Sequence, residues 1–275
     1  MIRSLVPPPA AAALLAAAAA FAPGASAARP VRPIVSLSAT PAHLALRAWT
    51  SQTVVVRNRG SRRVRVFATP SSFSFDLYGN ARIAAGSQPR RSARAWLTVR
   101  PGRLVLAPGK RGVFRITAQP PRGASPGDHH ALVLLSARAL RNERVAIGTR
   151  LGVLVFVRVP GRVVRRVTIG RAWVSRTRAS GSIAVTAINR GNLAERLLSG
   201  QVTVAMWRAR RLVTSLRGPT LDLLPRSRGL VLIPVRQRLR GLFTAVVRIA
   251  AQPGRTSEPS APPLAGVRRA FTLRL

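Results

Sequence analysis

The run Val54-Val55-Val56-Arg57-Asn58-Arg59-Gly60 carries the clearest structural signal in the chain, because three β-branched residues lead into a turn triplet. A second run, from Ile183 to Asn189, ends in the same triplet, Asn189-Arg190-Gly191. A strand-like segment follows each copy, Arg63 to Phe67 after the first and Gln201 to Trp207 after the second. β-branched runs bounded by Asn and Gly predict strands that end in turns. The repeated order of strand, turn and strand predicts two copies of one β-fold.

Side-chain alternation indicates which face of each flanking strand is buried. Charge and hydrophobe alternate from Arg63 to Phe67, which places Val64 and Val66 on one face. The same alternation recurs later, with apolar residues on one face at Phe114, Ile116 and Ala118. Ala131–Leu135 and Leu151–Val159 are apolar on both faces apart from one arginine. Such runs predict central strands.

The order of the later elements is the same in both halves. Gly229 to Val235 and Gly241 to Ile249 follow the second turn as Gly112 to Ala118 and Ala131 to Leu135 follow the first. Gly/Pro turns separate these strands at intervals of about 8–12 residues, which is typical of sandwiches and barrels. No segment of helical length has a 3.6-residue period. We therefore expect an all-β chain of two tandem immunoglobulin-like sandwiches.

The N-terminal residues predict export. Arg3 gives a positive start, Ala10 to Phe21 an apolar run, and Ala25-Ser26-Ala27 a small-residue cleavage site. The apolar run is shorter than the roughly 20 residues that a membrane-spanning helix needs. We expect a cleaved signal peptide over 1–27 and a mature protein that is secreted or held in the cell envelope. No later run approaches transmembrane length, so we expect no transmembrane segment in the mature chain.

The mature chain divides best at Pro160-Gly161, between two strand-like runs. The expected domains are a first immunoglobulin-like sandwich over 28–160 and a second over 161–275. The last apolar face closes the second sandwich, with members Phe271, Leu273 and Leu275. Because the chain has no cysteine, each domain has to be stable without disulfides.

Four short segments of the first unit resemble a known family. They run in the order 54–60, 68–80, 96–109 and 120–135, and include the Pro-Gly turns that precede two of the strands. Together they resemble the first domain of WxL-associated bacterial surface proteins (DUF916, described as a peptidoglycan-binding domain). That family lies within the wider group of PapD-like immunoglobulin domains. The resemblance covers roughly 34–157 and implies an immunoglobulin fold with a role in binding the cell wall. The second unit resembles the additional immunoglobulin-like domain of such proteins more loosely.

The net charge of +40, from 46 basic and 6 acidic residues, is the second unusual feature. Such a surface attracts anionic polymers, and more weakly as salt rises. Arginine pairs at turns and strand ends are the candidate polyanion contacts: Arg62, Arg63, Arg90, Arg91, Arg165, Arg166, Arg210 and Arg211, with Arg268-Arg269 as a further pair. Guanidinium groups bind phosphate bidentately, so wall polymers, lipid headgroups and nucleic acid are all eligible ligands. A solubilising surface on a GC-rich coding background explains the arginines equally well.

Residues that could carry catalysis are few and scattered. The six acids share no short motif: Asp76, Asp128, Glu143, Glu195, Asp222 and Glu258. A glycosidase needs two carboxylates that face one cleft, and here only the fold could bring such a pair together. No Gly-x-Ser-x-Gly motif and no cysteine nucleophile are present. We expect neither enzymatic activity nor a cofactor.

Asp128-His129-His130 is the only cluster of metal-ligand residue types. Neighbouring residues on a strand point to opposite faces, and zinc needs three or four converging ligands. We therefore expect no metal site, and interpret the triplet as a turn aspartate followed by two half-exposed histidines. The tryptophans are expected in core or inter-sheet packing, with stacking on sugars or bases as the alternative: Trp49, Trp96, Trp173 and Trp207.

Two functional hypotheses follow. The first is a non-catalytic envelope protein that binds a cell-wall polymer or another surface protein. The alternative is a periplasmic pilus-type chaperone that donates a strand to unfolded subunits and holds a terminal carboxylate with a basic pair. A general nucleic-acid binder is a third reading, but no nucleic-acid-binding motif accompanies the charge, so we expect no specific nucleic-acid partner.

Overall fold

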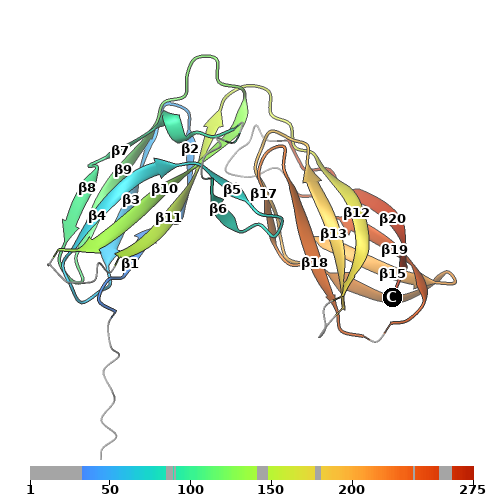
Figure 1. The fold of residues 1–275 in the computed structure, drawn as a ribbon. Helices are drawn as coiled ribbons and strands as arrows, with labels where there is room; N and C mark the ends of the chain where they lie inside the picture. Colours follow the sequence, from blue (N-terminus) through green and yellow to red (C-terminus); the bar gives the residue numbers. More distant parts are fainter. Residues whose placement is uncertain are drawn as a thin grey trace, which may run out of the picture. The chain divides into compact units, whose positions relative to one another are not determined.

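The computed structural model describes residues 33–84, 89, 91–140, 148–176, 181–237, 239–253 and 262–275. Within these ranges the chain is all-β apart from one short 3-10 helix, η1 (Arg94–Trp96), which confirms the expected fold class (Figure 1). The predicted signal peptide over 1–27 lies outside the described residues. No helix in the described ranges has the length and apolar character needed to cross a membrane.

The first sandwich consists of two facing sheets. One has the strand order β1-β3-β9-β7, with bounds Leu37–Thr40, Ser51–Asn58, Arg111–Ala118 and Leu97–Arg100. The other has the order β2-β11-β10-β4-β8, with bounds His43–Arg47, Gly148–Val159, Gly127–Ala139, Val64–Ser71 and Arg103–Leu106. A hairpin follows β4, made of β5 (Phe73–Phe75) and β6 (Ala81–Ile83).

This strand order is that of an immunoglobulin sandwich. In such domains strands A, B, E and D face strands G, F and C. Here β1, β3, β9 and β7 take the first set of positions, and β11, β10 and β4 take the second. Strand β2 is added beside β11 in parallel, and β8 is added beside β4.

The core of the first sandwich lies between its two sheets. Phe114 and Ile116 enter it from β9, and Val64 and Val66 from β4, each 0% exposed. The predicted alternation of these strands is thereby confirmed. Burial of each such side chain contributes roughly 1.5–3 kcal/mol relative to exposure. The arginines between them, such as Arg65, are left on the outer face.

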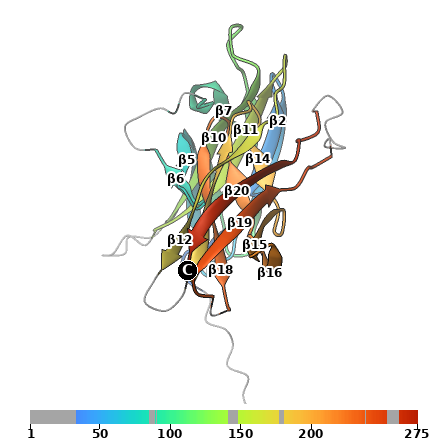
Figure 2. The ribbon, with the colours of Figure 1, turned by 90° about the vertical axis from the view of Figure 1, so that its right-hand side faces the viewer.

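The second sandwich has the same plan. One sheet has the order β12-β13-β18, with bounds Val167–Arg176, Gly181–Asn189 and Arg228–Val235. The other has the order β16-β15-β19-β20, with bounds Arg211–Arg217, Val202–Arg208, Leu242–Ile249 and Val267–Arg274 (Figure 2). A short pair joins β14 (Glu195–Leu197) to β17 (Leu221–Leu223). Strands β13, β15, β18 and β19 occupy the positions of β3, β4, β9 and β10, which confirms the predicted repeat of strand order.

The Asn-Arg-Gly triplets form the same buried turn in both sandwiches. Gly60 N–H and Gly191 N–H each donate to the Oδ1 of the asparagine two residues earlier, both at 2.9 Å. A Cβ on Gly60 would lie 2.6 Å from the Ile34 carbonyl oxygen, and one on Gly191 would lie 2.3 Å from that of Val164. Both approaches are to backbone atoms. The repeated glycine is therefore required by the close passage of a neighbouring chain segment.

Strand β11 departs from its predicted central position. Strand β10 is central, between β11 and β4, as expected. Strand β11 pairs with β10 along its whole length, but β2 covers its other edge only from Leu154 to Arg158. Among the described residues, no strand pairs with the outer edge of β11 from Gly148 to Val153. Half of this apolar strand is therefore an edge.

Candidate partner-binding site

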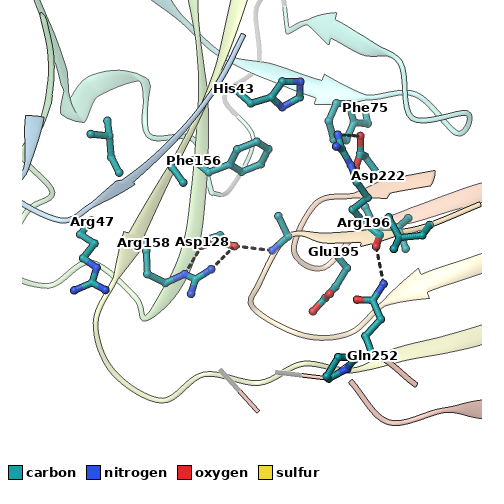
Figure 3. Close-up of a pocket in the computed structure, with 16 residues that line it drawn as sticks. His43, Arg47, Phe75, Asp128, Phe156, Arg158, Glu195, Arg196, Asp222 and Gln252 are labelled. Carbon is teal, nitrogen blue, oxygen red and sulfur yellow. Dashed lines mark hydrogen bonds and ion pairs between the residues drawn. The ribbon is translucent and has the colours of Figure 1, made fainter. Parts of the chain in front are cut away.

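A pocket of about 820 Å³ lies on the outer face of β2 and β11 (Figure 3). His43 and Arg47 of β2 and Phe156 and Arg158 of β11 form one wall. Residues of the second sandwich complete the lining: Ala194, Glu195, Arg196, Leu198, Asp222, Leu223, Gln252 and Pro253. A buried apolar cluster of Phe73, Leu132 and Leu224 also contains residues from both sandwiches. The pocket is thus built by two structurally similar domains.

Asp128 holds the pocket together. One carboxylate oxygen pairs with Nε of Arg158, and the other accepts from Nη2 of Arg158 at 3.1 Å. The second oxygen also accepts the backbone N–H of Ala194 at 2.8 Å. The Asp128 side chain is only 5% exposed, so these charge-assisted bonds form in a largely dry environment. They fix the Arg158 guanidinium (Figure 3) and, through its backbone N–H, Ala194.

Arg47 is the exposed member of a basic pair. It stands in direct parallel register with Arg158 on the neighbouring strand. Arg158 is committed to Asp128, whereas no hydrogen bond to the side chain of Arg47 is present in the described part of the chain. Two arginines therefore stand side by side at one pocket, with Arg47 exposed and Arg158 half-buried.

Three of the six acids converge on this pocket, which the sequence did not indicate. Glu195 pairs with Arg165 through two bonds of 2.7 and 2.8 Å, and both side chains are 1% exposed. Asp222 pairs with Arg196 at 2.7 and 2.9 Å. Each of the three carboxylates, of Asp128, Glu195 and Asp222, thus accepts two hydrogen bonds from one arginine. The acids of the pocket therefore anchor arginine side chains.

The unpaired edge of β11 leads toward the pocket. Leu154 N–H donates outward to the Ala42 carbonyl, and the Arg158 carbonyl accepts outward from Ala48 N–H. Because backbone direction alternates along a strand, the N–H and C=O groups of Arg150 and Gly152 point the same way. Among the described residues, these outward groups have no strand partner. They form a template for an added strand.

The Asp128-His129-His130 triplet is buried, which corrects the expectation of half-exposed histidines. His129 and His130 are 4% and 3% exposed, because η1 and the β5–β6 segment cover this end of β10. The His129 ring lies 4.4 Å from that of Trp96, and the His130 ring lies 5.1 Å from that of Phe73. No group of three or more potential metal ligands occurs in the described ranges.

Burial also lowers the pKa of both histidines. The pKa of His129 falls chiefly through desolvation, and Arg91 acts in the same direction. Burial lowers the pKa of His130 from 6.5 to about 4, and His129 and Arg91 reinforce the shift. Among the described residues, the ring nitrogens of His130 have no hydrogen-bond partner of good geometry, although a backbone contact with Phe73 raises the pKa and opposes the shift. Both rings are therefore neutral, packed groups at neutral pH.

The tryptophan expectation is wrong for Trp49. This residue is 60% exposed and has a φ of +60°, in a turn after β2. Trp173 is 37% exposed, on β12. Only Trp96 among the four packs against a described core cluster. The left-handed backbone at Trp49 is unusual for a bulky residue and explains why strand alternation failed to place it.

The predicted arginine contacts have different environments. The expectation of a surface contact is wrong for Arg165, which is buried and forms an ion pair with Glu195. Arg91 is half-buried and donates to the carbonyls of Pro126 and Asp128 at 3.2 and 3.3 Å. Arg90 lies outside the described residues. The other candidates are exposed, and their role as polyanion contacts stays a prediction: Arg62, Arg63, Arg166, Arg210 and Arg211.

Comparison with known proteins gives structural likeness only. No protein-family model and no curated protein matches the chain, so the expected DUF916 relationship finds no support. The solved structures similar to it include the class 5 fimbrial chaperone CfaA, with 12% identity, a TM-score of 0.46, and coverage of 86% of this chain and 98% of that one. The Pseudomonas aeruginosa chaperone CupB2 has 13% identity, a TM-score of 0.39, and coverage of 86% and 100%. The assignment of the immunoglobulin fold rests on the strand orders described above.

Proposed function

We propose that this protein is an exported binding protein that captures an extended segment of a partner protein by strand addition at the outer edge of β11. The observation that carries the proposal is the half of β11 from Gly148 to Val153, which pairs with no second strand among the described residues and leads toward a pocket with an exposed arginine. This corresponds to the chaperone alternative more closely than to a polymer-binding role. Export itself remains an inference from the N-terminal sequence.

An apolar strand with an open edge is a liability for a soluble protein. Natural proteins usually protect such edges with charges, prolines, bulges or covering segments. Leu151 is half-buried on the edge half of β11, and Val35 and Leu37 pack partly against the same core. The edge half of β11 and the neighbouring 35–37 segment therefore present backbone groups and partly buried apolar side chains together. Both features favour an added strand with alternating apolar residues.

The pocket gives the captured segment a direction. Strand β2 already pairs in parallel with β11, so this edge accepts a parallel neighbour. A segment that runs parallel along Gly148–Val153 would leave the edge where β2 begins and end beside the pocket. Arg47 lies opposite Arg158, five positions beyond Val153, so a segment that continues about four residues past the edge would bring its terminal carboxylate to Arg47, while Asp128 keeps Arg158 in place. Similar solved structures include a chaperone bound to a tip adhesin and one bound to a pilin, and our proposal places this chain in the same functional class.

A synthetic peptide of alternating valine and threonine with a free C-terminal carboxylate tests the proposal. Arg150→Pro removes one outward N–H, and proline is tolerated where a strand N–H faces solvent. Arg150→Gln removes the same charge and keeps the N–H, so it is the matched control. We expect the proline variant to lose binding and the glutamine variant to keep it. Equal affinity of the two variants would contradict capture at this edge.

The carboxylate is tested separately from the edge. Arg47→Gln should weaken binding of the acid form of the peptide about tenfold, the cost of one charge-assisted contact. A C-terminal amide on the peptide should weaken binding to the native protein equally. In the Arg47→Gln variant the amide should weaken binding no further, because the two changes remove the same interaction between the peptide carboxylate and Arg47. Additive losses would show that the peptide end does not contact Arg47.

A further inference from the structure

Three arginines form a straight row across the outer face of the second sandwich. They are Arg217 of β16, Arg248 of β19 and Arg268 of β20. Thr203 of β15 lies between the first two. Thr203 pairs directly with Arg217 on one side and Arg248 on the other, and Arg248 pairs with Arg268. All three arginines are exposed. We call them the arginine row.

The arginine row has no neutralising acid in the described part of the chain. The ion pairs that the structure shows involve other arginines, at Arg82, Arg158, Arg165 and Arg196. Like charges directly opposite each other on adjacent strands destabilise a sheet. Arg248 and Arg268 are opposed in this way. A bound anion would remove that repulsion, which solvent and salt only reduce.

One side of the arginine row is bordered by short side chains. The next row consists of small or short side chains, namely Ser215, Ala205, Val246 and Ala270. Neighbouring strands lie about 4.8 Å apart, so the arginine row spans roughly 14 Å from β16 to β20. A linear chain laid across the four strands would pass all three arginine positions. Guanidinium binds phosphate oxygens in a planar, bidentate manner.

We propose that the arginine row is a binding site for a linear phosphate polymer, separate from the partner-binding edge of β11. The row differs from the general positive charge of the protein because its three members are fixed in register on one rigid sheet. Strand pairing orders their backbones before the ligand arrives, which lowers the entropic cost of binding. The proposal does not depend on the function proposed for β11.

Inorganic polyphosphate is the probe, and its affinity is measured over a salt series. The row variant is Arg217→Gln with Arg248→Gln and Arg268→Gln. The control variant is Arg94→Gln with Arg103→Gln and Arg122→Gln, three exposed arginines that share no strand row. Both variants lower the net charge by three. Any effect of total charge is therefore the same in the two proteins.

We expect the row variant to lose at least tenfold in affinity and the control less than threefold. The slope of log K against log salt should fall by about 2 in the row variant, since each phosphate contact contributes about 0.7 for a single-stranded polyanion. Polyphosphate should also raise the melting temperature of the native protein more than that of the row variant. Equal losses in the two variants would overturn the proposal.

Three further measurements make the outcome specific. Without ligand, the row variant should melt no lower than the native protein, because the changes remove an unfavourable opposition of charges. Its affinity for the valine–threonine peptide should be unchanged. For dextran sulfate of equal charge, the affinities of the row variant and the control variant should differ less than they do for polyphosphate. If the row variant loses affinity for dextran sulfate by the same factor, the surface is a general polyanion site and the phosphate assignment is wrong.

Discussion

Asn58 and Asn189 hold equivalent positions at the ends of β3 and β13, and their side chains make the same hydrogen bonds. Nδ2 of Asn58 donates to the carbonyls of Arg62 at 2.7 Å and Leu106 at 3.1 Å. Nδ2 of Asn189 donates to the carbonyls of Leu193 at 2.7 Å and Leu224 at 3.1 Å. Both residues are at most 1% exposed. Each asparagine thus closes a turn and ties it to a segment more than thirty residues away.

Asn58→Ala should destabilise the first sandwich by about 3 kcal/mol, because it leaves buried backbone groups without their partner. Asn189→Ala should do the same to the second sandwich. Chemical denaturation followed by tryptophan fluorescence measures both effects. Asn58→Asp is the informative control, since a carboxylate facing two carbonyls should cost more than alanine does. A change below about 0.5 kcal/mol, the range of ordinary surface substitutions, would contradict the structural role.

The buried pair of Arg165 and Glu195 gives a second prediction. Removing one partner, as in Arg165→Met, should destabilise the fold by about 3–5 kcal/mol, because a buried carboxylate loses its countercharge. The double variant with Glu195→Leu should recover most of that loss. Denaturation of the single and double variants forms a mutant cycle that measures the coupling. Additive effects in the cycle would show that the two groups act independently.

The buried histidine His130 predicts a pH dependence of stability. Its pKa is about 4 in the folded state, below the ordinary histidine value of 6.5, so the unfolded chain binds the proton more readily. Its contribution to stability is therefore fully present above about pH 6.5 and is lost as the pH falls toward 4. The loss amounts to about 3 kcal/mol, from 1.36 kcal/mol per unit of pKa. His130→Phe should flatten this part of the profile, and an unchanged slope would refute the assignment.

Asp128 gives a prediction on the pocket itself. Asp128→Ala removes the carboxylate that pairs with Arg158 and accepts Ala194 N–H. We expect a loss of about 3 kcal/mol in the free energy of unfolding. Asp128→Asn should lose less, since an amide oxygen still accepts one N–H. If the two variants are equally destabilised, hydrogen bonding at this position matters less than charge.

The fold could be predicted because its signals are local. Strand alternation depends on neighbouring residues, so Val64, Val66 and Phe114 were placed correctly on the core face. The recurrence of one turn at Asn58 and Asn189 then predicted two similar domains. These signals need no knowledge of which strands pair.

The site could not be predicted because it depends on long-range pairing. Asp128 meets Ala194 only when the two sandwiches contact each other, and Arg47 meets Arg158 only through the parallel pairing of β2 with β11. The apolar pattern of β11 is the same for a central strand and for an edge that awaits a partner. Trp49 was misplaced because a left-handed turn breaks the alternation on which its prediction depended.

Hydrogen exchange of β11 amides tests the central proposal most directly. With the valine–threonine peptide bound, we expect slower exchange at Arg150 and Gly152, whose N–H groups point outward, than in the peptide-free protein. The N–H groups of Leu151 and Val153 point toward β10, so their exchange rates should change little. These alternate residues of the same strand are the internal control. This every-second-residue protection would establish strand addition. Peptide binding with no added protection at Arg150 and Gly152 would contradict it.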